Sequence, residues 1–390
     1  MRNIANFFTL FWIIYYPTCI AFNDLPGFSN IDEIMTVVLM FYTFVQYKSR
    51  AINKKTWKEY IIFLFVLTFY LIYSLQFGRN ESEAVWLDLV QQIRPFSIIY
   101  CTMILDPQFS SKQKGIIIKT MVATLVLWIV YHPETIESSA AEFPVLGQLA
   151  ISTGMVYYLF TKDTAKNHRI ALLIVLTGML APKFKFLGEV VCFVALVYFL
   201  KGRLNFKSPK TVLYLLILVG VIIFITWSRF DNYYVSGLDN DNLARPMTYK
   251  TSLKILSDYF PFGSGMGSFA TAAAAKVYSP IYYEYHLSEV WGLGGGGKAF
   301  ISDAFYPSLA QFGVVGVFLF VCFWKRRLHE MNNILDKRYY RMAFMTFFCL
   351  AIEQTADSSW LSGKGMGYCM ILALCLNANR HLMSVHKKML

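Results

Sequence analysis

Apolar stretches of about 20 residues recur along the whole sequence, separated by short polar segments. An α-helix of that length crosses the hydrocarbon core of a bilayer while pairing all of its own backbone groups. Of the 390 residues, 56% are hydrophobic and only 15% are charged, whereas soluble proteins carry about 25% charged residues. We therefore expect an all-α, polytopic integral membrane protein.

Hydropathy predicts about twelve spans in a single membrane domain that covers residues 1–390. Nine spans fall in residues 1–228 and three in 302–390, with one long polar loop at 229–301 between them. The first span lacks a small-residue cleavage site, so we expect a spanning helix there and not a signal peptide. The predicted spans lie near residues 5–22, 31–47, 57–77, 86–105, 115–131, 143–161, 169–182, 184–200, 211–228, 302–324, 341–357 and 364–379.

The loops alternate in charge. Residues 48–58 and 162–169 are rich in lysine and arginine, whereas residues 23–33 and 78–84 are acidic or neutral. Basic loops remain on the cytoplasmic side of a membrane, which accounts for the net charge of +12 without a nucleic-acid partner. The alternation predicts that both termini are cytoplasmic and that the long loop is extracytoplasmic.

Charged residues within or beside the apolar spans are candidates for function. Arg94 lies in the middle of the fourth span, where a charge is costly and needs a partner or a cavity. Either it pairs structurally with Asp88 or Glu353, or it contributes to a substrate site. Lys183 and Lys185 lie in a hairpin that is predicted to be external, against the charge pattern, and we interpret them as a basic lining for an anionic ligand.

The long loop contains a predicted short helix that begins at Arg245–Pro246 and ends before Pro261. One face of this helix is apolar, so the helix is expected to lie on the membrane surface. Arg245 stands at the helix N-terminus, where unpaired backbone N–H groups favour a phosphate. The apolar face consists of Tyr249, Leu253, Leu256 and Phe260.

Other polar features of the loop are less specific. The segment 263–268, Gly-Ser-Gly-Met-Gly-Ser, lacks the lysine of a phosphate-binding loop, so it predicts a tight turn. His286 and Glu289 are three residues apart and share one helical face, while Asp303 opens the tenth predicted span. These three residues are the candidates for proton transfer. The seven cysteines show no metal-ligand spacing and are expected to be packing residues.

An arginine, an amphipathic helix, a Pro-Phe-Gly-x-Gly-x-Gly turn and a later Gln-Phe-Gly-Val-Val-Gly follow one another over residues 245–320. This order resembles the O-antigen ligase/polymerase superfamily, and specifically the Wzy-type polysaccharide repeat-unit polymerases. The rest of the chain is similar to that family in topology and in the 183–189 hairpin. Ligase members typically have His-Asn where this chain has Ser302-Asp303, which favours a polymerase, whereas His286 keeps a ligase possible.

The resemblance implies a glycosyltransferase of the bacterial inner membrane. Such an enzyme transfers the growing glycan from undecaprenyl pyrophosphate onto a lipid-linked repeat unit at the outer face of that membrane. The implied partners are the lipid-linked oligosaccharide, the bilayer, a flippase and a chain-length regulator. No cofactor is expected, because the donor is already activated.

The residues themselves suit that chemistry. Arginine stabilises a departing pyrophosphate through a planar, permanently charged fork. Arg245 is the first candidate for this role, followed by Arg229, Lys183, Lys185 and Arg94. Asp303, Glu289 and His286 remain alternatives for the base that deprotonates the acceptor. No metal is expected, because basic side chains can replace a divalent ion. There are two rival classes. One is a transporter or flippase, but the internal repeat that is common in transporters is not seen in this sequence. The other is a non-catalytic membrane subunit.

Overall fold

The computed structural model describes residues 2–21, 30–47, 53–131, 143–181, 183–204, 207–239, 242–294 and 296–389. Within these residues the fold is all-helical, with no strand and an isolated β-bridge between Gly294 and Gly297. The elements are α1 (Arg2–Tyr15), η1 (Tyr16–Ala21), α2 (Ile31–Tyr47), α3 (Lys54–Phe77), α4 (Ser82–Leu105), α5 (Ser111–Tyr131), α7 (Phe143–Phe160), α8 (Ala165–Leu176), η2 (Thr177–Leu180), α9 (Phe184–Val194), η3 (Ala195–Phe199), α10 (Pro209–Ile225), α11 (Trp227–Tyr234), η4 (Ser236–Asp239), α12 (Ala244–Asp258), α13 (Ala272–Lys276), α14 (Ile281–Glu284), η5 (Leu287–Glu289), η6 (Tyr306–Phe312), α15 (Gly313–Asn332), α16 (Lys337–Glu353), η7 (Ser359–Leu361) and α17 (Gly363–Met389).

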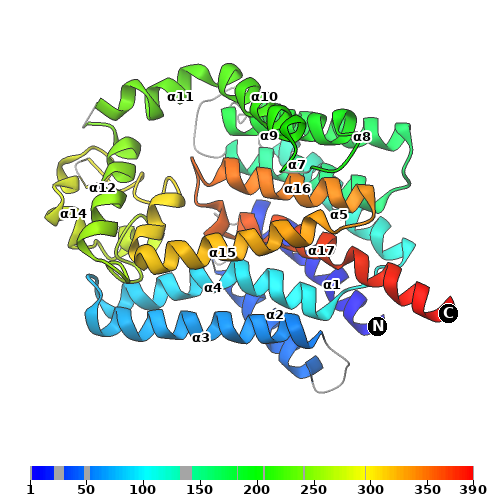
Figure 1. The fold of residues 1–390 in the computed structure, drawn as a ribbon, viewed down its shortest axis with the longest axis horizontal. Coiled ribbons are helices and arrows are strands. Elements are labelled where there is room, and N and C mark those ends of the chain that lie inside the picture. The colour runs from blue at the N-terminus through cyan, green and yellow to red at the C-terminus, as the bar shows by residue number, and fades with distance from the viewer. Residues whose placement is uncertain are drawn as a thin grey trace.

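The long helices form a bundle along the longest axis of the molecule (Figure 1). Helix α4 packs against α2, α3 and α17, and α17 also packs against α16. Both chain termini lie at one end of the bundle, while α12 and α14 lie at the opposite end (Figure 1). The interior is filled by aromatic side chains such as Trp12, Tyr15 and Trp360, all nearly fully buried.

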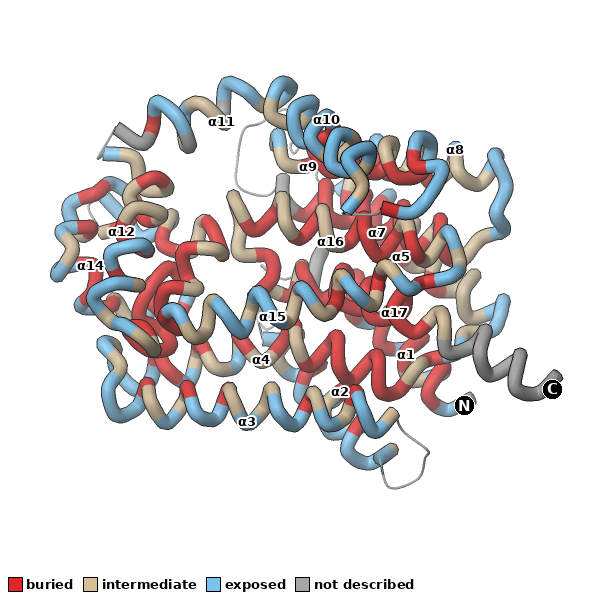
Figure 2. The backbone as a smooth tube through the Cα atoms, in the orientation of Figure 1, coloured by how far each residue is buried: buried red, intermediate tan, exposed pale blue. Residues whose placement is uncertain are grey.

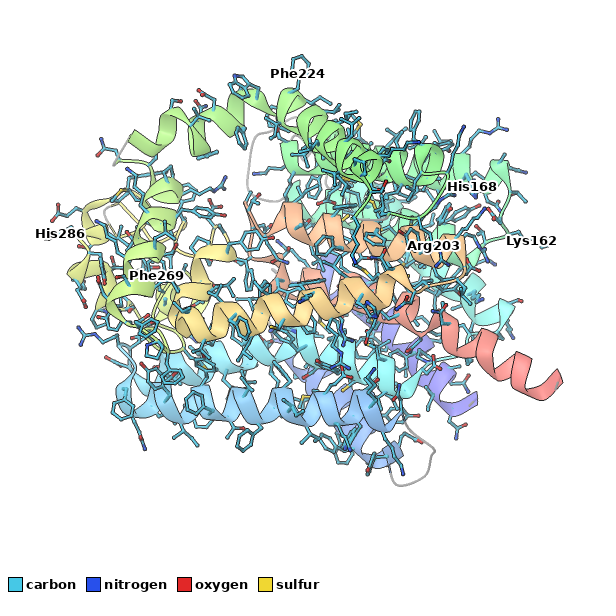
Figure 3. All side chains as sticks on the ribbon, in the orientation of Figure 1. Lys162, His168, Arg203, Phe224, Phe269 and His286 are labelled. Atoms are coloured by element: carbon cyan, nitrogen blue, oxygen red, sulfur yellow. The ribbon has the colours of Figure 1, made fainter. Side chains whose placement is uncertain are left out.

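The outer surface of the bundle is apolar. The helical segments Lys54–Phe77, Ser111–Tyr131 and Tyr306–Asn332 are long and apolar enough to cross a membrane. Figure 2 shows that α3 and α10 are largely exposed, whereas α4 and residues 363–379 of α17 are largely buried. Phe224 of α10, labelled in Figure 3, is 82% exposed. A helix that is apolar all round suits lipid and not water, so these features indicate a helical membrane protein. Each predicted span overlaps a helical segment, but a total of twelve membrane crossings remains a prediction.

The start of the tenth predicted span is wrong. Residues 301–305 form turns, followed by the 3₁₀-helix η6, and the regular helix α15 begins only at Gly313. The Phe305 N–H donates to the Gln354 carbonyl, 3.0 Å away, so it does not bond within a helix of its own segment. Asp303 therefore lies in a turn before the helix and not in the helix itself.

The long loop folds into a module with its own core, which we call the loop module (residues 242–294 and 296–301). Helix α12 packs into this core through Ile255, beside Phe269 and Tyr282. The predicted apolar face does not pack into this core as a whole: Leu256 packs against it, whereas Leu253 and Phe260 are 69% and 70% exposed. Besides Ile255, the buried residues of α12 are Pro246, Thr248, Thr251 and Ser252.

The glycine segment joins the loop module to the bundle, which confirms the predicted tight turn. Gly263, Gly265 and Gly267 all have positive φ values, a conformation that side chains disfavour. The Gly267 N–H donates to the buried Asp88 carboxylate at 3.0 Å, and Gln311 Nε2 donates to the same oxygen at 2.8 Å. This buried carboxylate therefore anchors the turn and the end of η6 to α4.

Candidate functional site

Arg245 lies in the first turn of α12, within one residue of the predicted helix start. Its Nε donates to Asp303 Oδ2 at 2.9 Å, and its guanidinium group also contacts that oxygen through Nη2. The guanidinium carbon stands 4.3 Å from the centre of the Tyr233 ring of α11. The N-cap residue of α12 is Leu243, which provides no side-chain cap. Arg245 and Asp303, predicted for two different roles, are therefore an ion pair in the structure.

Asp303 is positioned by hydrogen bonds between its own turn and the loop after α16. The Ser358 hydroxyl donates to the Ser302 carbonyl, and the Phe305 N–H donates to the Gln354 carbonyl. These two bonds flank Asp303 on either side. They hold the turn against residues 354–358, which carry a second carboxylate, Asp357.

Lys185 lies in the first turn of α9, and its side chain is only 8% exposed. Its Nζ is 2.6 Å from Asp357 Oδ2 and 3.8 Å from Glu353 Oε1. The N-cap residue of α9 is Lys183, which provides no side-chain cap. Helices α9 and α12 thus each present a cation at an N-terminus whose N-cap residue provides no side-chain cap, and the helix dipole there also favours an anion.

The two ion pairs act on one another electrostatically, since Asp357 and Lys185 both influence Asp303. We call the four residues Arg245, Asp303, Lys185 and Asp357 the ion-pair cluster. Burial raises the pKa of Asp303 above its ordinary value, Arg245 counteracts this shift, and Asp357 adds to it. Burial would also raise the pKa of Asp357, but Lys185 and Lys364 hold it below the ordinary value. The two carboxylates therefore differ: Asp303 holds a proton more readily than Asp357.

His286 and Glu289 do not join the cluster. His286 lies at the periphery of the loop module (Figure 3), and the two side chains are 84% and 80% exposed. Their separation is 3.8 Å, so they form a surface pair. Neither residue is among the groups that shift the pKa of Asp303. The geometry gives no support to either of them as the base.

Arg94 has different partners from those predicted. Its Nη1 is 2.7 Å from Asp32 Oδ2, and its Nη2 is 2.5 Å from Glu33 Oε1. It also donates to the Leu361 carbonyl at 2.7 Å. Asp88 instead anchors the glycine turn, and Glu353 approaches Lys185. Arg94 therefore joins α4 to α2, which favours the structural role over substrate binding.

The remaining candidates are placed less fully. Arg229 belongs to α11, but its side chain lies outside the described residues. Lys183 is half-buried and lies two residues before Lys185 in the chain. It forms no ion pair with any residue that the structure describes. Of the sequence candidates, Arg245, Asp303 and Lys185 are the ones that the structure brings together.

Sequence reasoning missed Asp357 and Tyr233. Asp357 ends the predicted span 341–357, just as Asp303 opens the span 302–324, so an acid at a span boundary was visible in both places. Only the pairing of the two loops reveals that these boundaries meet. Tyr233 carries no comparable pattern, because an aromatic residue in a polar loop is common.

The ion-pair cluster can bind an anion and accept a proton. Arg245 and Lys185 offer donors to phosphate oxygens, and the helix N-termini add partial positive charge. Asp303, with its raised pKa, can take a proton from a hydroxyl group held nearby. A comparison with protein-family models and with curated protein sequences finds no match for this chain.

Proposed function

We propose that the protein is a polysaccharide polymerase of the bacterial inner membrane. It transfers the growing glycan from undecaprenyl pyrophosphate onto an incoming lipid-linked repeat unit. The observation that carries this proposal is the ion-pair cluster, in which Arg245 and Lys185 stand at two helix N-termini beside Asp303 and Asp357. Asp357 follows the end of α16, and Asp303 precedes η6 and α15. The ion-pair cluster therefore lies at the ends of apolar helices of the membrane domain.

The proposed topology has twelve spans, cytoplasmic termini and an extracytoplasmic loop module. It is supported by the position of both termini at one end of the bundle and of the loop module at the other (Figure 1). It is also supported by the basic character of the loops at the end where the termini lie. In this arrangement the ion-pair cluster faces the side where lipid-linked substrates arrive already activated.

Cysteine labelling tests the topology. In a background that carries Cys322→Ser, which removes the exposed thiol among the described cysteines, and also Cys19→Ser, His286→Cys is expected to react in intact cells with a membrane-impermeant thiol reagent. Asn333→Cys, exposed in the turn after α15, is expected to react only after the cells are opened. Modification of Asn333→Cys alone in intact cells would reverse the orientation and remove the extracytoplasmic site.

The reaction proposed is a single displacement at the anomeric carbon of the donor sugar. The acceptor hydroxyl oxygen forms the new bond to that carbon while the carbon–oxygen bond to the pyrophosphate breaks. The acceptor proton passes to Asp303, and the electron pair of the broken bond leaves with undecaprenyl pyrophosphate. Arg245 and Lys185 stabilise the negative charge that develops on the leaving group. Pyrophosphate binding to Arg245 also releases Asp303 from its ion pair, so the base becomes free when the donor is bound.

The pH profile tests the role of Asp303. Burial raises the pKa of its carboxyl group, so the base becomes protonated, and activity falls, at a higher pH than for an ordinary aspartate of pKa about 3.9. Arg245 lowers this pKa, so the residual kcat/KM of Arg245→Gln is expected to decline at a higher pH than that of the wild type. If kcat/KM of Arg245→Gln falls at the same low pH as that of the wild type, Asp303 is not the base.

The raised pKa of Asp303 also predicts in which direction folding stability changes with pH. The folded state binds this proton more tightly than the unfolded chain, so the contribution of Asp303 to stability is full at pH values below its unfolded pKa. This contribution is lost as the pH rises through the folded pKa. Asp303→Asn, which cannot titrate, is expected to remove this part of the pH dependence of the thermal unfolding temperature.

The direct test of function is incubation of the purified protein with lipid-linked repeat units. A ladder of glycans that grows by one repeat unit is the expected product. A single transfer to a lipid A-core acceptor, without a ladder, indicates the ligase reaction instead. The exposed position of His286 gives the ligase no geometric support.

A lipid-linked oligosaccharide flippase is the second candidate. It is favoured by the buried ionisable residues Arg94, Glu189 and Glu353, because ionisable residues inside membrane domains often mark transport paths. Liposomes separate the two functions. A flippase moves labelled lipid-linked repeat units between leaflets without changing their length, whereas a polymerase lengthens them.

A further inference from the structure

A second polar cluster is buried next to the ion-pair cluster, inside the bundle. Glu189 of α9 and Glu353 of α16 are both 0% exposed, and their side chains interact directly. Gln148 of α7 donates from Nε2 to Glu353 Oε2 at 2.5 Å. Tyr368 of α17 donates to Glu189 Oε2 at 3.3 Å. Four helices therefore enclose two carboxyl groups that lie against each other.

This buried cluster has too few hydrogen-bond donors. The Oε1 atoms of Glu189, Glu353 and Gln148 accept no hydrogen bond from any residue that the structure describes. Lys185 Nζ is 3.8 Å from Glu353 Oε1, beyond hydrogen-bonding distance, because Asp357 holds it at 2.6 Å. A buried acceptor without a donor is unfavourable. The Ser359 hydroxyl beside Glu353 and the Cys349 thiol beside Glu189 can satisfy at most two of these three acceptors, so a further donor is needed.

Positive charges near the two carboxyl groups are also too few. The ionisable groups that act on Glu189 are Glu353, Lys185, Tyr368 and the thiols of Cys192 and Cys349. Those that act on Glu353 are Lys185, Asp357, Glu189, Tyr368 and the thiol of Cys349, with Gln148 and Ser359 as uncharged neighbours. Lys185 is the one cation in this set, and Asp357 already pairs with it. Two ionised carboxylates in contact would therefore stand in a low-dielectric interior with a single shared counter-charge.

We propose that Glu189 and Glu353 share one proton and form a buried acid pair with a single negative charge. The shared proton supplies the missing donor between the two carboxyl groups and removes their mutual repulsion. A sodium ion is a poorer occupant, because it requires several oxygen ligands around it and the two carboxyl groups already contact each other. The proposal concerns proton binding within the membrane domain and does not depend on the transfer reaction.

The acid pair is linked to the ion-pair cluster through Lys185, which approaches both Glu353 and Asp357. An anion that draws Lys185 away from Glu353 removes a positive charge from beside the pair. The pair then binds protons more tightly, and by reciprocity protonation of the pair favours anion binding at the cluster. The fold thereby couples a buried proton site to the proposed substrate site.

Infrared difference spectroscopy of the purified protein tests the pair directly. We expect the carbonyl stretch of a protonated carboxylic acid to persist at neutral pH, where isolated carboxyl groups are ionised. Glu189→Gln and Glu353→Gln should each abolish this band, because the remaining carboxylate can then pair with Lys185 without a shared proton. Glu83→Gln, an exposed carboxylate in the first turn of α4, is the matched control and should leave the band unchanged.

Each other outcome overturns the proposal. Absence of the band in the wild type means that both carboxylates are ionised. If sodium then raises the thermal unfolding temperature at constant ionic strength, and choline does not, the occupant is a metal cation. A band that survives in both glutamine variants belongs to another residue. The readout does not involve glycan transfer, so a failure here and a failure of the proposed polymerase are distinguishable.

Discussion

Replacing Arg245 by alanine is expected to lower the rate of glycan transfer by roughly 30-fold to 1000-fold, equivalent to about 2–4 kcal/mol of transition-state stabilisation. The loss falls mainly on the rate and not on donor binding, because charge builds up on the pyrophosphate as the bond to the sugar breaks. Arg245→Lys should recover only part of the rate, since an ammonium group keeps the charge but not the two-pronged hydrogen bonding. Polymer length and single-turnover rates at matched protein amounts measure both effects.

The structure adds a requirement to this experiment. Arg245 is the ion-pair partner of Asp303, whose side chain is only 26% exposed, so Arg245→Ala leaves a largely buried carboxylate without its cation. Arg245→Ala combined with Asp303→Asn removes that uncompensated charge and separates instability from lost catalysis. If the double variant regains the wild-type unfolding temperature but not activity, the loss is catalytic.

Arg79 provides a matched control for Arg245. It too pairs with a carboxylate, Glu284, at 2.8 Å, and its guanidinium group lies over a tyrosine ring, that of Tyr259. It differs in being exposed, with 48% of its side chain accessible. Arg79→Ala is expected to retain normal polymer length. Normal polymer from Arg245→Ala would remove Arg245 from the site and leave Lys185 as the principal anion ligand.

Replacing Gly267 by alanine is expected to cost about 2–5 kcal/mol of stability. Gly267 has a φ of 70°, and a Cβ added there would lie 2.5 Å from the Ala84 carbonyl oxygen. The residue cannot move away easily, since its N–H is held by Asp88 at 3.0 Å and its carbonyl by Asn80 at 2.6 Å. The loop module should therefore detach from α4, and activity should fall with the unfolding temperature.

Gly220→Ala is the control for this substitution. Gly220 lies in the exposed helix α10, and nothing is within 4 Å of a Cβ added there. Alanine at that position should be neutral or stabilise the helix by up to about 1 kcal/mol. Thermal unfolding of the purified variants, followed by tryptophan fluorescence, compares the two substitutions. Equal unfolding temperatures for Gly267→Ala and Gly220→Ala would show that the glycine turn does not anchor the loop module.

The sequence by itself determined the helical class, the approximate positions of the helices and the start of α12. These features depend on local properties: the length of apolar runs, the proline near Arg245 and the glycines before the turn at 263–268. The candidates Arg245, Lys185 and Asp303 were also visible locally, because charged residues beside apolar runs are rare and need a reason. Each of these inferences uses residues that are neighbours in the chain.

Only the tertiary structure decided which charges meet. Arg94 pairs with Asp32 and Glu33, about 60 residues away, and Lys185 pairs with Asp357, 172 residues away. Such partners follow from how helices pack, and packing depends on the complementary shapes of entire helix faces, which a sequence pattern does not encode residue by residue. The turn at Asp303 exists for the same reason, since the hydrogen bond from Phe305 to Gln354 replaces a bond that a local helix would have made. The sequence thus specified where charge enters the apolar bundle, while the packing of α9, α12 and α16 specified which charges form the site.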